Sequence, residues 1–430
     1  MQTLKEAEVE LRGHIIDSLI LPRVFATIYD LDGEFEVLEF NIGKTKSEHS
    51  YAKILIKGKN EEHLRILLKE IQKIGAILVE EVEEVKLAPA PADGVLPDNF
   101  YSTTNHPTYI RLDEEWVKCE NIEMDKVIVV KNGLPVCVPM RKVKKGDLVV
   151  LNESGIKVVP PERSRKREVF GFMGSDVSPE KPTTSLVKIL AKEMHRMKVE
   201  NEKIVVVAGP AVIHSGASDA LAELIRMGYV NVLLSGNAMA VHDIERSLYG
   251  TSLGMNLETL EGYEGGHRHH LMAINEVRKY GSIKRLVEAG VLSKGVMYEC
   301  IINKVPFVLA GSIRDDGPLP EVITDVLEAQ DAMRKHLKGA KLVLMLATML
   351  HSIAVGNMLP STVKIVCVDI NPSAVTKLTD RGTYALGIVS DVGAFLPQLV
   401  QELKNIEEKN RTSMHVRGKC LQIKEGKEEV

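Results

Sequence analysis

The first residues suited to chemistry are a charged triplet, Arg314-Asp315-Asp316, directly after the apolar run 306–313. A guanidinium group can hold a substrate carboxylate through two parallel hydrogen bonds. Two adjacent carboxyl groups can acquire separated pKa values, so that one serves as a base and the other orients it. Asp-Asp-Gly-Pro is also good turn chemistry. The triplet therefore predicts either a site for carboxylate binding and proton transfer or a tight turn.

Histidines form the second group, because seven of the 13 lie between residues 214 and 351. Three of them stand in the segment GGHRHH (265–270). This segment could contact a substrate, bind a metal or begin a helix after a glycine hinge. We expect no metal site, since neighbouring residues on one short segment rarely all face one ion and no second ligand set has metal spacing. His351 could contact a cofactor or a substrate.

A nucleotide site is indicated by Asp369, which lies at the end of an apolar run. A carboxylate at that place can accept hydrogen bonds from two ribose hydroxyls. Asn371 and Pro372 follow as a helix cap and a first-turn residue. Asp369 could equally help to cap that helix, and both interpretations stay open.

The usual dinucleotide fingerprint G-x-G-x-x-G is absent, because Gly209 and Gly216 have six residues between them. Any dinucleotide must therefore be held differently. The small residues Gly236, Asn237 and Ala238 could let backbone N–H groups approach phosphates. We treat this as a weak indication of the same site.

Short apolar runs precede these polar segments, and we interpret them as strands of one sheet over residues 175–410. The predicted strands are 203–209, 231–236, 306–313, 341–347, 364–370 and 385–391. Helical stretches separate most of them, which is typical of an open, largely parallel α/β sheet with helices on both faces. Ligands bind such sheets at the carboxyl ends of the strands. The sequence thus predicts a ligand crevice lined by 209–218, 236–243, 311–320, 348–357, 369–372 and 390–393.

The chain before this region predicts two smaller domains. Residues 1–95 suggest a ferredoxin-like α+β unit, with strands at 34–40, 51–57 and 76–85 and a helix over 61–76 capped by Asn60. The proline-rich stretch 86–98 is typical of a linker. Residues 99–170 form a β-rich middle domain with a turn at Asn132-Gly133. The segment 411–430 is a polar tail without a clear fold signal.

Composition excludes some partners. Lys and Arg total 55 against 59 Asp and Glu, a net charge of −4, and aromatic residues make up only 4%. A nucleic-acid binder would carry a basic surface or stacking aromatics, so we expect no nucleic-acid partner. The five cysteines include no Cys-x-x-Cys pair, which fits a reducing compartment.

One segment, 342–359, is about the length of a membrane span. It contains His351 and Asn357, which are costly inside a bilayer, so a strand, a polar loop and a helix explain it better. The N-terminus has no apolar stretch of the signal-peptide kind. We therefore expect a cytoplasmic protein with no membrane partner.

Longer motifs add a resemblance to one known family. They are YSTTNHPT (101–108), GPAVIHSG (209–216), GNAMAVHDIE (236–245), GTSLGMNL (250–257), EGGHRHHLMAIN (264–275), LAGSIRDDGPLP (309–320), MLATMLHSIAVGN (345–357) and VDINPSAVTKLTDRG (368–382). Together they resemble the archaeal and cyanobacterial-type ornithine cyclodeaminases, often labelled LOR/SDH after the lysine-oxoglutarate reductase/saccharopine dehydrogenase region. The resemblance covers roughly residues 11–400. We expect no counterpart of the arginine-degrading extension of cyanobacterial relatives.

The resemblance implies conversion of L-ornithine to L-proline and ammonia with tightly bound NAD⁺, in a Rossmann-like, deoxyhypusine-synthase-like domain. A hydride leaves the α-carbon and returns to the cyclic imine, so no net redox change occurs. The cofactor contacts that it implies are Asn237, Ala238, Asp315, Thr348, Met349, Leu350, His351, Asp369, Asn371, Asp391 and Val392. These positions coincide with the strand ends identified above.

The chemistry needs a base for the α-ammonium group and a cation for the α-carboxylate. Asp316, His267 or His270 could be the base, and Arg314 or Arg268 could bind the carboxylate. Water must be excluded, because imine hydrolysis would release a keto acid. The segment 101–108 is a candidate lid. NAD enzymes of this architecture commonly associate, so we also expect a homo-oligomer, a dimer or tetramer.

Two other functions share this crevice. A saccharopine-type NAD-dependent amino acid dehydrogenase would use the same hydride step but release NADH. A regulatory protein that senses NAD or an amino acid would bind ligand without turnover. Fold alone does not separate these alternatives, whereas the stoichiometry of products does.

Overall fold

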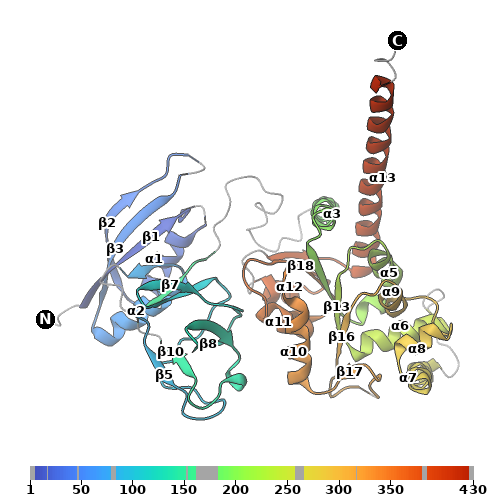
Figure 1. Cartoon of the computed structure of the whole chain (residues 1–430), viewed down its shortest axis with the longest axis horizontal. Coiled ribbons are helices and arrows are strands. Elements are labelled where there is room, and N and C mark those ends of the chain that lie inside the picture. Colours follow the sequence, from blue (N-terminus) through green and yellow to red (C-terminus); the bar gives the residue numbers. More distant parts are fainter. Residues whose placement is uncertain are drawn as a thin grey trace. The chain divides into compact units, whose positions relative to one another are not determined.

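The computed structural model describes residues 5–16, 18–45, 48–78, 84–151, 154–160, 183–256, 266–315, 317–379 and 385–425 (Figure 1). The chain divides into two compact units. The first contains Met1–Gly174 and Asn357–Thr362, and the second contains Ser175–Gly356 and Val363–Val430. Each unit has its own sheets.

The first unit begins with a four-stranded sheet in the order β2-β3-β1-β4. Its elements are β1 (Lys5–Gly13), α1 (Ile20–Asp30), β2 (Glu34–Asn41), β3 (Ser50–Gly58), α2 (Glu61–Lys73) and β4 (Ile77–Leu78). The side chain of Asn60 accepts a hydrogen bond from the His63 N–H at 2.8 Å, which confirms the predicted cap of α2. Of the strand predicted over 76–85, Ile77–Leu78 form β4, and residues 79–83 lie outside the described residues.

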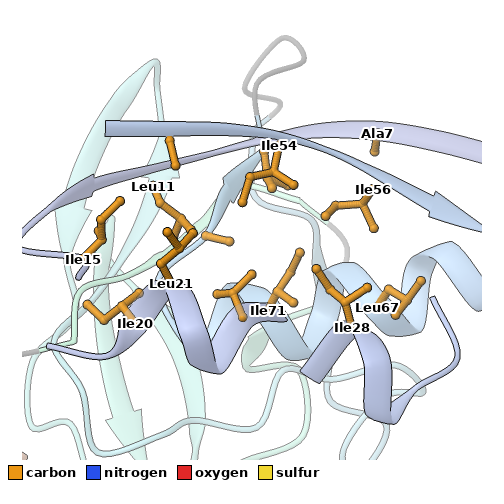
Figure 2. Close-up of a cluster of buried hydrophobic side chains, with 14 of the residues drawn as sticks. Ala7, Leu11, Ile15, Ile20, Leu21, Ile28, Ile54, Ile56, Leu67 and Ile71 are labelled. Carbon is orange, nitrogen blue, oxygen red and sulfur yellow. The ribbon is translucent and has the colours of Figure 1, made fainter. Parts of the chain in front are cut away.

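An apolar core fills the space between this sheet and its two helices (Figure 2). Val9 and Leu11 of β1, Ile54 of β3 and Leu67 of α2 are at most 1% exposed. Strand β1 is absent from the sequence prediction, because glutamates alternate with its buried residues and make the segment look charged throughout. That alternation is itself the signal of a strand with one buried face.

The rest of the first unit is β-rich. Its strands are β5 (Leu87–Pro89), β6 (Thr108–Leu112), β7 (Glu115–Lys118), β8 (Val127–Lys131), β9 (Leu134–Val138), β10 (Leu148–Val150) and β11 (Ile156–Val158). They form sheets in the orders β5-β10-β8-β9 and β11-β6-β7. Asn132 and Gly133 have φ angles of 52° and 77°, which a two-residue hairpin turn requires. The predicted turn is confirmed.

The prediction of a linker over 86–98 is wrong in part. Ala88 pairs with Val149, and the whole of β5 pairs antiparallel with β10. The prolines around β5 are compatible with this role, since β5 is an edge strand that needs hydrogen bonds on one side only. Proline content alone therefore hid a short strand.

The described residues of the second unit form a parallel sheet of seven strands in the order β17-β16-β13-β12-β18-β19-β20. Their bounds are β12 (Lys203–Ala208), β13 (Val232–Gly236), β16 (Phe307–Ala310), β17 (Val322–Ile323), β18 (Ala340–Leu346), β19 (Lys364–Asp369) and β20 (Ala385–Val389). All six predicted strands are confirmed. Only β17, which is two residues long, is additional.

Helices connect these strands. They are α3 (Thr183–Val199), α4 (Ala211–His214), α5 (Ser218–Arg226), α6 (Asn237–Tyr249), α7 (His269–Tyr280), α8 (Ile283–Glu288), α9 (Val296–Ile302), α10 (Val326–Leu337), α11 (Met349–Asn357), α12 (Pro372–Thr379) and α13 (Val392–Glu425). Figure 1 shows α10, α11 and α12 on one face of the sheet and α5, α6 and α9 on the other. The predicted Rossmann-like α/β architecture is confirmed.

The polar segment 411–430 carries no clear fold signal in its sequence, and its residues up to Glu425 continue helix α13. The apolar segment 342–359 forms β18 and α11, as predicted. Among the described helices, none combines the length and the apolar character of a membrane span.

The strand order places a switch of chain direction beside β12. The chain runs from β12 to β13, β16 and β17 on one side, then continues with β18, β19 and β20 on the other. The connections at the carboxyl ends of β12 and β18 therefore diverge to opposite faces. In open α/β sheets this divergence leaves the crevice in which ligands bind.

Candidate active site

Two glycines let the chain pack closely at the carboxyl edge of the sheet. A Cβ atom on Gly209, after β12, would lie 2.2 Å from the backbone oxygen of Ala347, after β18. A Cβ atom on Gly236, at the end of β13, would lie 2.8 Å from Cε1 of His351. Real Cβ contacts are not this short. At Gly209 the obstacle is backbone, so a side chain there would displace the chain, whereas at Gly236 the His351 ring would have to move. The edge around the direction switch is thus a close-packed backbone surface.

His351 is the best-defined polar side chain at this edge. It belongs to α11, and its Nδ1 lies 3.3 Å from the Thr348 hydroxyl. Burial lowers the pKa of His351, while the nearby carboxylate of Asp315 acts in the opposite direction. The ring is therefore neutral at pH 7, with one nitrogen able to donate and the other able to accept.

Apolar side chains project from the same strand ends. Leu350 is 74% exposed and Ile370 is 71% exposed, and Ile313 and Met349 are exposed as well. Large exposed apolar residues gathered at strand ends suit the flat rings of a bound ligand, since small-molecule sites are mostly apolar with a few placed polar groups. The implied cofactor contacts Met349 and Leu350 belong to this apolar surface.

The acidic residues after β19 and β20 act as helix caps. Asp369 accepts a hydrogen bond from the Asn371 N–H at 2.8 Å, and Asn371 accepts one from the Ser373 N–H at 2.9 Å. Asp391 accepts one from the Gly393 N–H at 3.0 Å. Each contact engages one oxygen. Asn371 and Asp391 cap α12 and α13 directly, whereas Asp369 holds the backbone of the cap residue Asn371. Val392 is buried, which leaves only its backbone for a ligand.

Asn237 is 4% exposed, and its side-chain oxygen accepts a hydrogen bond from the Leu319 N–H at 3.0 Å. It therefore anchors the loop 311–320 on the first turn of α6, next to half-buried Ala238. Asp315 accepts a hydrogen bond from the Ser312 N–H at 2.8 Å, which closes a turn over residues 312–315. The turn predicted over Asp-Asp-Gly-Pro (315–318) includes Asp316, which lies outside the described residues. Arg314 is exposed.

The same loop packs on α7. Arg278 donates a hydrogen bond to the backbone oxygen of Pro318 at 2.9 Å. The start of α7 carries His270, which is half-buried, and follows Arg268, which is exposed. Two segments that hold predicted catalytic residues therefore meet on α6 and α7. Asp316 and the side chain of His267 lie outside the described residues.

A buried carboxylate that sequence reasoning did not single out organises this region. Glu245 of α6 is 0% exposed. It accepts hydrogen bonds from the Thr251 hydroxyl at 3.0 Å, the Gly254 N–H at 3.0 Å and the Leu253 N–H at 3.3 Å, and its Oε2 lies 2.9 Å from His242 Nδ1. Burial raises the pKa of Glu245, but the donors outweigh it and the net pKa is lowered.

The contacts of Glu245 extend to the histidine segment. Thr251 Oγ1 lies 2.7 Å from Nδ1 of His269. Residues Thr251–Asn256 form the hairpin of β14 (Thr251–Ser252) and β15 (Met255–Asn256), and a Cβ on Gly266 would lie 2.3 Å from the Gly254 oxygen. The short helix η2 (Gly266–Arg268) is therefore seated on a hairpin that Glu245 holds.

His214 and His242 form a pair of histidine rings that belongs to the same network. The rings of His214 and His242 meet edge to face, with centroids 4.7 Å apart. His214 Nδ1 lies 2.7 Å from the Ser252 hydroxyl. Burial, together with repulsion from His242, lowers the pKa of His214 to about 4. His214 is thus neutral at physiological pH, and α4 and α6 contribute facing imidazoles at neighbouring strand ends.

The contacts of Glu245 are with residues three to nine positions away, but they depend on how the chain turns back after α6, which the sequence pattern does not reveal. One local signal was available: His242 and Glu245 are three residues apart on a helix, a spacing that places them on one face. No group of three or more His, Cys, Asp or Glu side chains in the described residues has a geometry that could hold a metal ion.

Family models match most of the chain. Residues 6–106 match the LOR/SDH bifunctional enzyme conserved region. Residues 107–187 match the first region, and residues 188–399 the Rossmann fold, of the C-terminal part of ArgZ-like arginine dihydrolases.

Curated and solved relatives agree with these matches. An ornithine cyclodeaminase of Methanopyrus kandleri is 61% identical over 94% of this chain and 99% of its own length. The crystal structure of apo ArgZ, a cyanobacterial arginine dihydrolase, aligns with a TM-score of 0.83 and 40% identity over 95% of this chain and 59% of that one. The ternary complex of AgrE with ornithine and NAD⁺ aligns with a TM-score of 0.53 and 42% identity over 94% and 58%.

These matches span both units. Four of the motifs that carry the resemblance (209–216, 236–245, 309–320 and 345–357) follow or overlap the carboxyl ends of β12, β13, β16 and β18. The chain belongs to the ornithine cyclodeaminase family.

Proposed function

We propose that this protein is an NAD⁺-dependent ornithine cyclodeaminase, which converts L-ornithine to L-proline and ammonia. The observation that carries the proposal is the carboxyl edge of the parallel sheet, where glycine-only backbone packing, exposed apolar side chains and a neutral histidine adjoin. The relatives named above support it. AgrE, 42% identical to this chain, has been crystallised with ornithine and NAD⁺ together.

The residues at this edge fit a dinucleotide. Gly236 precedes α6 without a side-chain cap, so the first N–H groups of α6 are open to an anion. Asp369 keeps one carboxylate oxygen beyond its capping bond for a ribose hydroxyl. We propose that Asn237, Ala238, Asp315, Thr348, Met349, Leu350, His351, Asp369, Asn371, Asp391 and Val392 surround NAD⁺, with Asn237 acting by holding the loop 311–320.

When bound, NAD⁺ supplies a hydride acceptor that is restored within each turnover, so the substrate is oxidised and re-reduced without net redox change. The chain must do the remaining work. We propose that Arg314 or Arg268, both exposed, binds the α-carboxylate. Asp316, His267 or His270 is proposed as a proton acceptor. Side chains around the apolar edge exclude water and so protect the imine from hydrolysis.

The proposed enzyme works in the cytoplasm as a homo-oligomer. The described cysteines are free and buried, which agrees with a reducing compartment. Val37, Leu38 and Phe40 are exposed on β2, an edge strand of the first sheet, and support self-association. Light scattering of the purified protein tests the oligomer: a monomer at micromolar concentration would contradict it.

The decisive assay uses purified protein, L-ornithine and NAD⁺ at a small fraction of the ornithine concentration. We expect proline and ammonia in a 1:1 ratio, in amounts exceeding the NAD⁺ added, with no lasting absorbance of NADH. Stoichiometric NADH would instead indicate a saccharopine-type dehydrogenase. Saturable ornithine binding with no product would indicate a sensing protein.

A further inference from the structure

We propose that His242 takes and returns the proton of the ornithine α-amino group, and that Glu245 positions His242 for this task. The proposal rests on the ornithine cyclodeaminase activity proposed above and assigns a residue that the sequence analysis left out. It replaces Asp316, His267 and His270 as the first candidate for the base, because the orientation and hydrogen-bonded state of His242 follow from described contacts.

Glu245 sets the tautomer of His242. Its Oε2 lies 2.9 Å from Nδ1, so Nδ1 carries the proton and donates it to the carboxylate. The lone pair then resides on Nε2, as in the histidine of a carboxylate–histidine catalytic pair. The side chain of His242 is 11% exposed and that of Glu245 is 0% exposed. A carboxylate this deeply buried orients the imidazole and stabilises the imidazolium ion that forms when Nε2 binds a proton.

Nε2 of His242 is available for a ligand. Within the described residues it has no hydrogen-bond partner, and it is not among the side-chain atoms that are both buried and unpaired. The other buried groups of the network all have partners: Thr251, Gly254 and Leu253 donate to Glu245, and His214 contacts Ser252. Nε2 of His242 is therefore open beside a carboxylate that holds Nδ1, which is the arrangement a proton acceptor needs. Nε2 of His214 also has no hydrogen-bond partner among the described residues, but its Nδ1 contacts a hydroxyl and not a carboxylate.

The position of His242 agrees with this role. His242 and Ala238 are four residues apart on α6, so they lie on one face of the helix, about one turn from each other. Ala238 stands in the first turn, two residues after Gly236, where an added Cβ would meet the His351 ring. The ring of His214, from α4 after β12, covers His242 from the side of the direction switch. The proton acceptor is thus one helical turn from the proposed cofactor edge.

The protons and the hydride can be followed through the whole reaction. Nε2 takes a proton from the α-ammonium group, and the free amine then loses hydride from its carbon to the nicotinamide ring of NAD⁺. The δ-ammonium group loses a proton to solvent, and the δ-amine attacks the resulting iminium carbon, which places two nitrogens on one carbon. The new ring nitrogen loses its extra proton to solvent. The imidazolium ion returns its proton to the α-nitrogen, and the C–N bond breaks to release ammonia. Hydride then returns to the cyclic iminium ion and gives proline. Of the two protons lost to solvent, one ends on the released ammonia and the other on the ring nitrogen of proline.

Two titratable groups face His242 among the described residues: Glu245 on its own helix and His214 on α4. His214 is neutral over the working range, because its pKa is about 4. Glu245 is therefore the charge that controls protonation of His242. Removing that charge destabilises the imidazolium ion, so the base stays unprotonated to lower pH.

The test measures kcat/KM for ornithine against pH in wild type, His242→Gln and Glu245→Gln. We expect His242→Gln to lose about 10²- to 10⁴-fold in kcat. We expect Glu245→Gln to lower kcat as well, because the imidazole loses the group that holds its tautomer, and to move the acid limb of the pH profile to lower pH. Glu299→Gln is the matched control, because Glu299 is also a buried carboxylate, 5% exposed, but binds Arg226 on another helix pair. It should leave the pH profile unchanged.

A second measurement does not depend on turnover. Histidine labelled at Cε1 and nitrogen reports the tautomer and the pKa of His242 by NMR in the full chain without ornithine. Wild type should show the Nδ1–H tautomer, and Glu245→Gln should lower the pKa. An unchanged tautomer and pKa in Glu245→Gln would refute the positioning role, and this result would stand even if wild type failed to make proline. Retention of more than a third of kcat by His242→Gln, or loss of the acid limb in His270→Gln alone, would refute the role of His242.

Discussion

Helices α2 and α6 are both 13 residues long and both pack against a sheet, yet they bury opposite chemistry. The buried residues of α2 are Leu64, Leu67 and Ile71, all apolar. Those of α6 include the polar side chains of Asn237, His242, Asp243 and Glu245. Burying a polar group is unfavourable unless it is paired, and each of these four has a partner. We infer that α2 serves folding, whereas α6 serves the site as well.

The two helices also begin differently. The side chain of Asn60 caps α2 by accepting the His63 N–H. Gly236 precedes α6 and offers no side-chain cap. A protein that optimised only stability would cap both helices, since a good cap contributes about 1 kcal/mol. The open end of α6 is consistent with a ligand that supplies the missing partner.

The largest effect on stability is expected from the apolar helix. Leu67 is fully buried in the core of the first unit (Figure 2), so Leu67→Ala removes packing and leaves a cavity. We expect the free energy of unfolding to fall by about 2–5 kcal/mol, measured by urea denaturation. Ornithine turnover per folded molecule should not change. A loss of kcat in the folded fraction would contradict the division of roles between α2 and α6.

A smaller and pH-dependent effect is expected from Asp243. Its carboxylate accepts hydrogen bonds from the Val296 and Met297 N–H groups at 2.9 and 2.8 Å, which holds the start of α9. Asp243→Asn should lower the free energy of unfolding by about 1–3 kcal/mol at pH 7, because one acceptor is replaced by an amide donor.

The direction of the pH dependence follows from burial, which raises the pKa of Asp243 to about 6. A raised carboxyl pKa means that the folded state binds the proton more tightly than the unfolded state. The stabilising contribution of that proton is full below about 4 and is lost as pH rises through 6. Wild type should therefore gain stability relative to Asp243→Asn as pH falls from 6 toward 4. Parallel stability curves for the two proteins would contradict the buried, proton-binding state of Asp243.

The smallest effects are expected at the first residues of α2 and α6, where one substitution should change stability and the other should change cofactor affinity. Asn60→Ala should cost about 1 kcal/mol of unfolding free energy without altering cofactor affinity. Gly236→Ala places a methyl group where the His351 ring now lies, so we expect NAD⁺ affinity to fall by about tenfold, measured by calorimetry. Gly356→Ala is the matched control, since its Cβ would meet only Met345 Cε at 3.9 Å. Equal losses of NAD⁺ affinity in both glycine variants would contradict the placement of Gly236 in the cofactor site.

Sequence patterns predicted the sheet of the second unit because buried parallel strands are continuous apolar runs, which few other structures produce. They failed for β1, whose alternating glutamates hide a half-buried strand, and for β5, whose prolines suggested a linker. The polar segment after residue 410 continues a helix that begins at Val392, and polarity alone did not reveal it.

The candidate site also has a part that the sequence predicts and a part that it does not. The strand-end segments were predictable, because a parallel sheet brings the carboxyl ends of its strands to one edge. The pairing of Glu245 with Thr251, Gly254 and His242 was not, since it depends on how the hairpin that directly follows α6 folds back onto that helix. Buried polar residues on an otherwise apolar helix are the signal that sequence reasoning should weigh more heavily.

The central claim is that a hydride leaves the α-carbon of ornithine and returns to the same molecule. Turnover of ornithine carrying deuterium at the α-carbon, with NAD⁺ at a small fraction of the substrate, tests this directly by mass spectrometry of the products. The account predicts proline that retains the deuterium, one ammonia per proline and no accumulation of reduced cofactor. Deuterium accumulating in NADH together with a keto acid, or proline formed without the label, would contradict it.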